Sequence, residues 1–554
     1  GPSQVTANMV KAWSSATKKF VYEHMLNLWT TRSTPAWFKD KLLKLAPKIA
    51  GKSELNNMRP ISLYEIIRKI WTTIVAKRIN LVWHQEKVLH SAQYGYQLDN
   101  GVHMALMNTL NHIEGAHIDR ETKYLTFWDI RRAFDSIPRT LQKLAWTRLG
   151  VPRDVTDWFV GLDEGGLTFI VTPYLDQEQA LHSSQDMLAL DRHMSSNPDL
   201  AFTAERGIGQ GESASSLMWT AMYDMLLEWI DPRNRELHRA EDLSYTDADA
   251  QQTHMNAYAD DLGTITAGPR AAQMQQLQAD WISAFCTFTG LVMNPAKIQP
   301  TTIGPRPPTP SRGLHVFQHD GTKVIISYDH DLPTFKYLGV QLDLRHDPLA
   351  ALQRLTTAAT DRLDHLIQQP GSVAAKINYI RFKILPIILY TALCANWTLK
   401  EYRSLDVCFS STYRKLLCMP SKSPTALLYL PKDMGGVGLP RLSDRAQVMK
   451  WEAMLRCMAV GRVPLNSVNT ILRRVPGPKH PPRTPIKTIR PPNQWSAPYG
   501  HIMARSLVEW AHQSGLQLAS RVYESPEEER AQIRNQTSIQ EVAELLHLWP
   551  SELY

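Results

Sequence analysis

The sequence predicts an α+β fold with a small antiparallel sheet, and three observations support this prediction. The stretch "KYLTFWDI" at residues 123–130 is apolar and β-prone, and residues 254–266 read as two strands joined by a tight turn. A strongly helical stretch at residues 213–230 lies between these strands, and another at residues 269–289 follows them. Strand-length apolar runs that alternate irregularly with longer helices are typical of α+β domains.

Length and composition indicate a basic protein with several subdomains. A chain of 554 residues is too long for one compact core, and its 43% hydrophobic residues exclude a disordered chain. The 61 Lys and Arg against 53 Asp and Glu give a net charge of +8, which suits a polyanionic partner. The sequence has neither a signal peptide nor an apolar run long enough to cross a bilayer, so no membrane association is expected.

The cysteines argue against a structural zinc module. They form no C-x-x-C pair and no Cys/His cluster at zinc spacing, which also favours a reducing, intracellular compartment. They are the widely separated Cys286, Cys394, Cys408, Cys418 and Cys457. The chain opens with Gly-Pro-Ser rather than Met, as a piece of a longer protein would.

The first part of the chain predicts helices around a basic stretch. Residues 8–30 and 64–83 read as amphipathic helices, and "KLLKLAPKIAGKSELNNMRPISL" between them is basic and turn-rich. After the strand that contains "TFWD", Ser136 is expected to cap a helix with Pro138 in its first turn and Gly150 at its end.

The rest of the chain is predicted to be mainly helical. Residues 165–205 lack periodicity and are expected to form a loop or hairpin insertion. The glycine-punctuated "RGIGQGE" precedes the helix at 213–230, and residues 347–460 read as mostly helical. "VPGPKHPPRTPIKTIRPPNQW" at residues 475–495 is typical of an extended basic linker, and the remaining residues read as helical.

Two adjacent acids, Asp260 and Asp261, lie at the tip of the predicted hairpin in "NAYADDLGTIT". An Asp pair also occurs in ordinary surface turns, where Asp tolerates unusual backbone angles. A third acid, Asp129, ends the strand "YLTFWD", and a strand beside the hairpin would bring the three carboxylates to one face. Such a cluster attracts hard cations and can hold two Mg²⁺ ions roughly 3.5–4 Å apart, with Mn²⁺ as an alternative.

Several short blocks occur in the order found in reverse transcriptases. They are "APK" with "NNMRPISL", "QYGY", "FWDIRRAFDS", "RGIGQGESASSL", "YADD", "GLVMNPAK" and "YLG". Over roughly residues 1–460 the chain therefore resembles the reverse transcriptases of LINE-type (non-long-terminal-repeat) retrotransposons, or a domesticated relative of them.

The resemblance implies a right-hand polymerase fold: fingers, a palm with a small antiparallel sheet and a helical thumb, followed by a C-terminal helical segment of unassigned role. The expected parts are fingers interleaved with the palm at residues 1–95, a palm with the catalytic hairpin at 96–342, a thumb at 343–460, a Pro-rich basic linker at 461–495 and the C-terminal segment at 496–554.

The resemblance also implies catalytic roles for individual residues. Asp129, Asp260 and Asp261 would be metal ligands, with the Ile130 carbonyl assisting and Asp261 the less direct ligand. Lys297 would protonate the departing pyrophosphate, although a solvated cation at a helix end is the alternative reading.

Four further residues are implied to contact the nucleotide sugar or the primer. Phe134, five residues after Asp129, would block a ribonucleotide 2′-hydroxyl, and an ordinary core aromatic is the alternative. Tyr337, Leu338 and Gly339 would pack against the primer strand, with strand core as the alternative.

The remaining substrate contacts would come from a glycine loop and from the basic stretch near the N-terminus. Gln210 and Gly211 would position the nucleotide or template, because a glycine lets the backbone approach closely. Lys48 and Arg59 would contact the triphosphate, although Lys52 fits the lysine position as well as Lys48 does.

Two departures from the family pattern concern the same glycine loop. Ser216 stands where Pro is usual, and Gly209 replaces a frequent basic residue. These departures leave the three carboxylates intact, but they bear on how the template is positioned.

The implied function is that of an RNA-directed DNA polymerase, a nucleotidyltransferase that extends a DNA or RNA primer with dNTPs copied from an RNA template. The alternative is a non-catalytic RNA-binding protein, or a domesticated cellular protein, that retains the polymerase fold. An RNA-directed RNA polymerase is disfavoured by Phe134. The expected location is intracellular, nuclear for a LINE-type protein and otherwise cytoplasmic, and the sequence predicts no oligomeric state.

Overall fold

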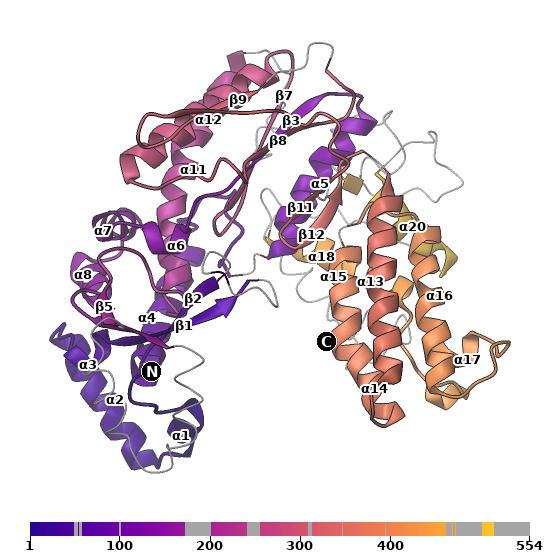
Figure 1. The fold of residues 1–554 in the computed structure, drawn as a ribbon, viewed down its shortest axis with the longest axis horizontal. Helices are drawn as coiled ribbons and strands as arrows, with labels where there is room; N and C mark the ends of the chain where they lie inside the picture. The colour runs from indigo at the N-terminus through magenta and orange to yellow at the C-terminus, as the bar shows by residue number, and fades with distance from the viewer. Residues whose placement is uncertain are drawn as a thin grey trace, which may run out of the picture.

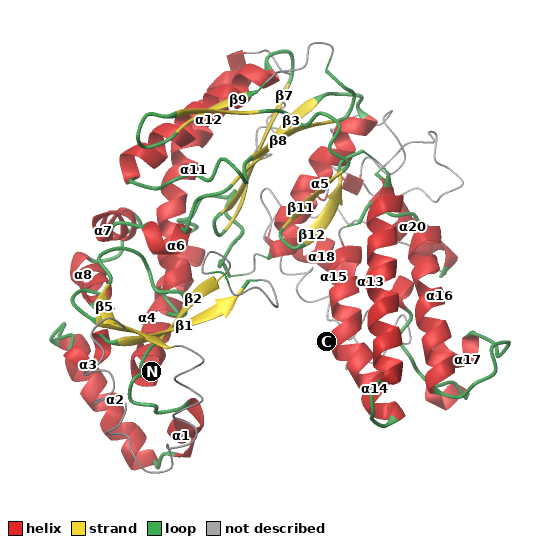
Figure 2. Ribbon diagram, in the orientation of Figure 1, coloured by secondary structure: helices red, strands yellow, loops and turns green. Residues whose placement is uncertain are grey.

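The fold is an arch, with an N-terminal lobe as one arm, a sheet with its helices at the top and a helical bundle as the other arm (Figure 1). Mixed helix and strand with only small sheets (Figure 2) confirms the predicted α+β class. The computed structural model describes residues 1–48, 54, 58–98, 101–171, 201–240, 255–307, 313–345, 347–393, 395–460, 468, 471–472 and 501–514.

The N-terminal lobe combines helices with a small sheet. Its strands run in the order β2-β1-β4-β5, so strands from beyond residue 165 complete a sheet begun before residue 65. The pairing of β4 with β5 bears out a hairpin at the ends of the predicted insertion, whose central residues lie outside the described ranges. The elements are α1 (Ala7–Ala12), α2 (Ser15–Thr30), α3 (Ala36–Lys39), β1 (Lys41–Pro47), β2 (Met58–Leu63), α4 (Ile66–Gln85), β4 (Leu167–Val171) and β5 (Ala201–Thr203).

Two predicted helix boundaries are wrong for local reasons. The single helix predicted over residues 8–30 is two helices, because the Ser14 side chain accepts a hydrogen bond from the Thr17 backbone N–H and starts α2. The helix predicted to begin at Ser136 begins instead after Pro138, and the Ser136 hydroxyl donates to the Ala133 carbonyl.

The central sheet is fully antiparallel in the order β6-β7-β3-β8. Trp128 at the end of β3 lies opposite Leu262 near the start of β7. The residue after Trp128 and the residues before Leu262 therefore lie at the same edge of the sheet. That edge contains Asp129 on one side and the Asp260–Asp261 turn on the other. The strands are β3 (Lys123–Trp128), β6 (Met255–Tyr258), β7 (Asp261–Ala267) and β8 (Gln299–Ile303).

Helices cover both faces of this sheet, which explains why every residue of β3 is buried. Leu125 and Phe127 belong to the core around α5, whereas Tyr124 and Trp128 belong to the core around α11 and α12. Alternate side chains of a strand point to opposite faces, so the two cores lie on opposite sides of the sheet. Helices α5 (Val102–Ile118) and α12 (Ala271–Thr289) contact the sheet directly, and α11 (Ser215–Ala240) packs against α12. Between this region and the N-terminal lobe lie α6 (Ala133–Ser136), α7 (Arg139–Arg148) and α8 (Arg153–Gly161) (Figure 1).

The second arm is helical, as predicted for residues 347–460. Its core includes the fully buried rings of Trp397, Tyr402 and Phe409. Two short ribbons precede it, β9 (Leu314–Phe317) with β10 (Lys323–Ile326) and β11 (Thr334–Tyr337) with β12 (Val340–Asp343). Its elements are α13 (Pro348–Gln368), α14 (Val373–Tyr379), the π-helix η3 (Ile380–Ile384), α15 (Leu385–Leu393), α16 (Leu399–Leu416), α17 (Ala426–Tyr429), the 3₁₀ helix η4 (Lys432–Met434) and α18 (Leu442–Val460).

A late helix, α20 (Ile502–Gln513), packs into the core that α5 forms with the sheet. The buried Glu114 carboxylate of α5 accepts a hydrogen bond from the Ile502 backbone N–H at 2.6 Å, and His501 Nδ1 lies 2.8 Å from the same carboxylate. The described part of the C-terminal segment, for which no role was predicted, is therefore integrated with the central sheet. Within the described residues, every helix is too short or too polar to cross a membrane.

A carboxylate of α16 holds the start of α18. Asp406 accepts hydrogen bonds from the Ser443 backbone N–H at 3.1 Å and the Ser443 hydroxyl at 2.5 Å. Burial nevertheless raises the pKa of Asp406 from 3.8 to about 6. The ionised carboxylate therefore destabilises the fold at neutral pH.

Asp406→Asn is expected to stabilise the protein at pH 7 but not at pH 4. The folded-state pKa lies above the unfolded value, so folding binds a proton in this interval and stability is lost as the pH rises through it. Asn keeps an acceptor for the Ser443 N–H without titrating, so its advantage should grow by roughly 1–3 kcal/mol from pH 4 to pH 7. Unfolding midpoints of both proteins at both pH values measure this, and a pH-independent difference would contradict it.

Candidate active site

The Asp-Asp hairpin has a tight turn, and an earlier segment of the chain forms hydrogen bonds along its first strand. Tyr258 pairs with Asp261, and Ala259 between them adopts a left-handed φ of +56°. The Ala257 N–H donates to the Ala92 carbonyl at 2.9 Å and its carbonyl accepts from the Tyr94 N–H at 2.8 Å, so the "QYGY" block runs alongside β6. A Cβ at Gly95 would lie 2.5 Å from the Ala259 nitrogen, which explains the glycine.

Asp129 is oriented by the loop that follows α12. Asn294 Nδ2 donates to Asp129 Oδ2 at 2.8 Å, and Lys297 Nζ lies 3.3 Å from Asp129 Oδ1. The Asn294 backbone N–H also donates to the Asp129 carbonyl, and Met293 forms an isolated antiparallel β-bridge with Ile130. Lys297 was predicted to lie at the site and Asn294 was not, although both stand in the "GLVMNPAK" block.

The three carboxylates are coupled electrostatically. Burial raises the pKa of Asp260, and the charge of Asp129 raises it further. The pKa of Asp261 rises to about 6 through burial of its carboxyl and through the charges of Asp260 and Asp129, although the residue remains partly open to solvent. The structure therefore places the three acids close enough to repel one another.

Their chemistry fits a hard divalent cation, because clustered oxygen donors whose pKa values are raised by mutual charge are stabilised when a cation binds. Among the described residues, however, no three acidic, His or Cys side chains are spaced as a preformed metal site. Asp129 is instead engaged by Asn294 and Lys297.

Phe134 and the glycine loop are tied together by their backbones. The Ile208 N–H donates to the Phe134 carbonyl at 2.7 Å, and the Gly207 N–H donates to the Ile137 carbonyl at 2.9 Å. Gly207 has a φ of +88°, and a Cβ there would lie 2.7 Å from the Asp135 carbonyl oxygen. The loop can therefore approach Phe134 only because a glycine stands at this position.

The same loop also contacts β2 of the N-terminal lobe. The Ser62 N–H donates to the Gln210 carbonyl at 2.7 Å, and a Cβ at Gly211 would lie 2.4 Å from the Ser62 carbonyl oxygen. A Cβ at Gly209 would overlap the Tyr64 hydroxyl at 1.7 Å. This steric limit accounts for glycine where the family frequently has a basic residue.

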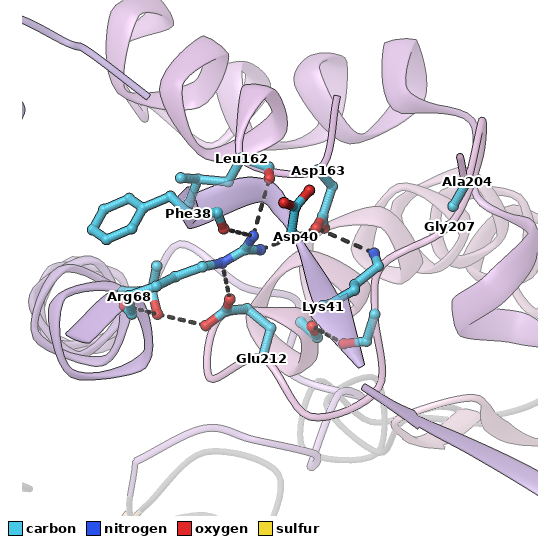
Figure 3. Close-up of polar contacts among 12 residues, drawn as sticks. Phe38, Asp40, Lys41, Arg68, Leu162, Asp163, Ala204, Gly207 and Glu212 are labelled. Carbon is cyan, nitrogen blue, oxygen red and sulfur yellow. Dashed lines mark hydrogen bonds and ion pairs between the residues drawn. The ribbon is translucent and has the colours of Figure 1, made fainter. Parts of the chain in front are cut away.

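A buried ion network, unforeseen from the sequence, fixes the end of this loop. Arg68 of α4 is 1% exposed and bonds to Glu212 Oε2 at 2.7 Å and to Asp163 Oδ1 at 3.0 Å. Figure 3 shows its guanidinium enclosed by these carboxylates and the carbonyls of Phe38 and Leu162, to which it donates at 2.6 and 3.0 Å. One side chain thus joins α4, the ends of α3 and α8, and the glycine loop.

The predicted triphosphate contacts lie on the small sheet of the N-terminal lobe. Lys48 follows β1, and Arg59 on β2 lies opposite Ala46, so both exposed cations lie at the same end of the strand pair. Burial raises the pKa of Asp135, whereas the charges of Arg132, Lys41 and Lys48 act to lower it. Lys48 is thus within electrostatic range of the segment that contains Phe134, and Lys52 lies outside the described residues.

The "YLG" block forms the turn between β11 and β12. Tyr337 is 3% exposed and donates from its hydroxyl to the Asn256 carbonyl at 3.2 Å, so its ring belongs to the core. Leu338 and Gly339 adopt positive φ angles in the turn, and the Leu338 carbonyl accepts from the Tyr390 hydroxyl at 2.6 Å. Only Leu338 and Gly339 of this block present surface to a partner.

Comparison with known proteins finds a matching family and distant relatives. Residues 47–342 match the family described as reverse transcriptase (RNA-dependent DNA polymerase). The retrovirus-related Pol polyprotein from a type-1 R2 retrotransposable element of Popillia japonica is 23% identical over 405 residues, which cover 72% of this chain and 50% of the relative. The corresponding R2 polyprotein of Bradysia coprophila is 22% identical over 468 residues, covering 83% of this chain and 48% of the relative.

Solved structures show a more distant similarity. Telomerase from Candida albicans, in complex with the TWJ fragment of telomeric RNA, is 10% identical with a TM-score of 0.35, and the match covers 80% of this chain and 64% of that chain. The chain spans about half the length of the curated relatives that it matches.

Proposed function

The chain belongs to the reverse transcriptase (RNA-dependent DNA polymerase) family, and from this premise we propose that it extends a primer 3′ end with deoxynucleotides copied from an RNA template. The observation that carries the proposal is the shared sheet edge, where Asp129 after β3 lies beside the Asp260–Asp261 turn between β6 and β7. A pure RNA-binding protein would gain nothing from carboxylates that repel one another, so this feature disfavours the non-catalytic alternative.

Reverse transcriptases use divalent metal ions, and Asp129, Asp260 and Asp261, with the Ile130 carbonyl, would hold them here. When bound, the ions supply charge stabilisation at the primer hydroxyl and the triphosphate. Mg²⁺ fits this donor set, and Mn²⁺ is the natural comparison.

The chain's own side chains would then orient the substrates. Lys48 and Arg59 would grip the triphosphate by charge, and Gln210 and Gly211 would present backbone to the nucleotide or template. Lys297, which lies beside Asp129 and is 66% exposed, would donate a proton to the departing pyrophosphate. Leu338 and Gly339 would support the primer from the exposed turn.

The similarity to R2 polyproteins supports a LINE-type retrotransposon origin. We propose a nuclear location on that basis, with RNA as template and DNA or RNA as primer.

Primer extension on an RNA template tests the proposed function directly. A labelled DNA primer annealed to RNA, supplied with dNTPs and either Mg²⁺ or Mn²⁺, should be extended to the template end. The same reaction with ribonucleotides should yield little product. Absence of extension with dNTPs under both metals would overturn the proposal.

Phe134→Ala is expected to admit ribonucleotides. The ring is half-buried and its backbone is fixed by Ile208, so truncation should open space near the sugar without displacing the loop. We expect selectivity for dNTPs over ribonucleotides to fall by about 10- to 100-fold, in the range of a lost steric contact. The ratio of kcat/KM for the two nucleotides measures this, and an unchanged ratio would show that Phe134 is only a core aromatic.

A further inference from the structure

We propose that Trp219 determines sugar specificity by positioning Phe134, as the middle ring of a stack that runs from Phe134 to the catalytic hairpin. The inference rests on the proposed polymerase function and deepens it. Trp219 touches no substrate in this proposal. It acts through the ring of Phe134, against which it stacks.

The stack is built from two adjacent pairs of nearly parallel rings. Phe134 and Trp219 have centroids 5.3 Å apart and planes 29° apart, and Trp219 and Tyr223 have centroids 5.4 Å apart and planes 28° apart. Trp219 and Tyr223 stand four residues apart on α11, so one helix face presents both rings. Both are fully buried, whereas Phe134 at the end of the stack is half-buried.

The far end of the stack reaches the catalytic hairpin. The Tyr223 hydroxyl donates to the Asp260 backbone carbonyl at 3.3 Å. At the near end, the Phe134 backbone is fixed by the Ile208 N–H. The hydrogen bond from Ile208 holds the backbone of Phe134 but not its side chain. The position of the Phe134 ring therefore depends mainly on the ring stacked against it, which is that of Trp219.

The indole of Trp219 serves as a flat surface and not as a hydrogen-bond donor. Its Nε1 is buried and has no hydrogen-bond partner within the described structure. An unpaired buried N–H is unfavourable, so the indole's contribution to the fold lies in the ring. A smaller side chain would leave a void below Phe134, and the ring could sink into it and uncover room for a 2′-hydroxyl.

The test compares Trp219→Leu with Trp219→Phe. Leu removes the aromatic surface, and we expect the ratio of kcat/KM for dNTPs to that for ribonucleotides to fall about tenfold, mainly through a lower ribonucleotide KM. Phe keeps an aromatic ring and loses only the unpaired N–H, so it should retain the wild-type ratio within about twofold. An unchanged ratio in Trp219→Leu would overturn the inference.

Trp146→Leu is the matched control for lost packing. Trp146 on α7 is also fully buried with an unpartnered Nε1, but it packs edge-on against Phe159 at 5.1 Å and lies outside the stack. Trp146→Leu should lower the unfolding midpoint about as much as Trp219→Leu does and leave nucleotide selectivity unchanged. An equal loss of selectivity in Trp146→Leu would show that general loosening, and not the stack, is responsible.

Two further readouts keep the inference separate from the proposed function and from misfolding. If Trp219→Leu does not fold, Trp219→Met offers an unbranched and more adaptable side chain of similar volume, and it is expected to show the same loss of selectivity. Tyr223→Phe removes only the hydroxyl and should lower kcat for dNTPs severalfold without changing selectivity. If wild type extends primers but Trp219→Leu and Trp219→Met keep its selectivity, this inference alone fails. A wild type that does not extend primers overturns the proposed function and this inference with it.

Discussion

Asp260→Asn is expected to abolish primer extension, with a loss of about three orders of magnitude or more in kcat/KM. Asn has nearly the same shape, but it is neutral and cannot supply the negative oxygen that a divalent cation needs. The hydrogen bond from Tyr223 goes to the Asp260 backbone carbonyl, so the substitution leaves that contact in place. The fold should therefore survive the loss of activity.

Stability measurements distinguish a loss of catalysis in Asp260→Asn from a loss of the fold. In the folded protein, burial and the charge of Asp129 raise the pKa of Asp260, so its ionised form is unfavourable at neutral pH. Without added divalent cations, Asp260→Asn should thus unfold at the same temperature as wild type or higher. Asp154→Asn is the control, since Asp154 is 57% exposed in a surface pair with Arg32, and it should keep full activity. Retained extension by Asp260→Asn would exclude the proposed active site.

The Asp-Asp hairpin could be predicted from sequence because its signals are local. Two strands, a two-acid turn and a following helix that ends at a glycine all lie between residues 254 and 290, and the structure confirms each of them. Gly290 has a φ of +73°, which is the left-handed end of a helix that such a glycine predicts. The prediction that Asp129 lies beside this hairpin needed only the pairing of β3 with β7.

Other contacts between distant segments could not be predicted. Asn294 and Asp129 are 165 residues apart in the chain, and Arg68 and Glu212 are 144 apart. No periodicity or local propensity marks such partners, since their proximity depends on how whole elements pack. The break at Ser14 is different, because a serine three residues before Thr17 is a local capping signal that the helical pattern over residues 8–30 concealed.

Integration of α20 depends on a similar long-range contact. Glu114 is buried near the C-terminal end of an apolar helix, a position that would be unfavourable without a partner. The partner is the first turn of α20, nearly 400 residues later, whose Ile502 N–H it accepts. A buried acid in an apolar helix was the available signal, but it does not indicate which distant segment satisfies it.

Arg68→Met is expected to be the most destabilising single substitution among those considered, by about 3–5 kcal/mol. Met fills similar volume, but Glu212 and Asp163 would lose the guanidinium that offsets the burial of their charges. Lys41, at 3.3 Å from Asp163, and the Thr72 hydroxyl, at 2.5 Å from Glu212, can compensate only in part. The unfolding midpoint in urea measures the effect.

A second substitution separates lost charge balance from lost packing. In Arg68→Met/Glu212→Gln the uncompensated charge on Glu212 is gone, so part of the lost stability should return, whereas simple loss of packing would not be relieved. Arg153→Met is the matched control, because Arg153 is 88% exposed in its pair with Asp157 and should change stability by about 0.5 kcal/mol or less. Equal midpoints for Arg68→Met and Arg153→Met would mean that the buried network does not hold the glycine loop to α4.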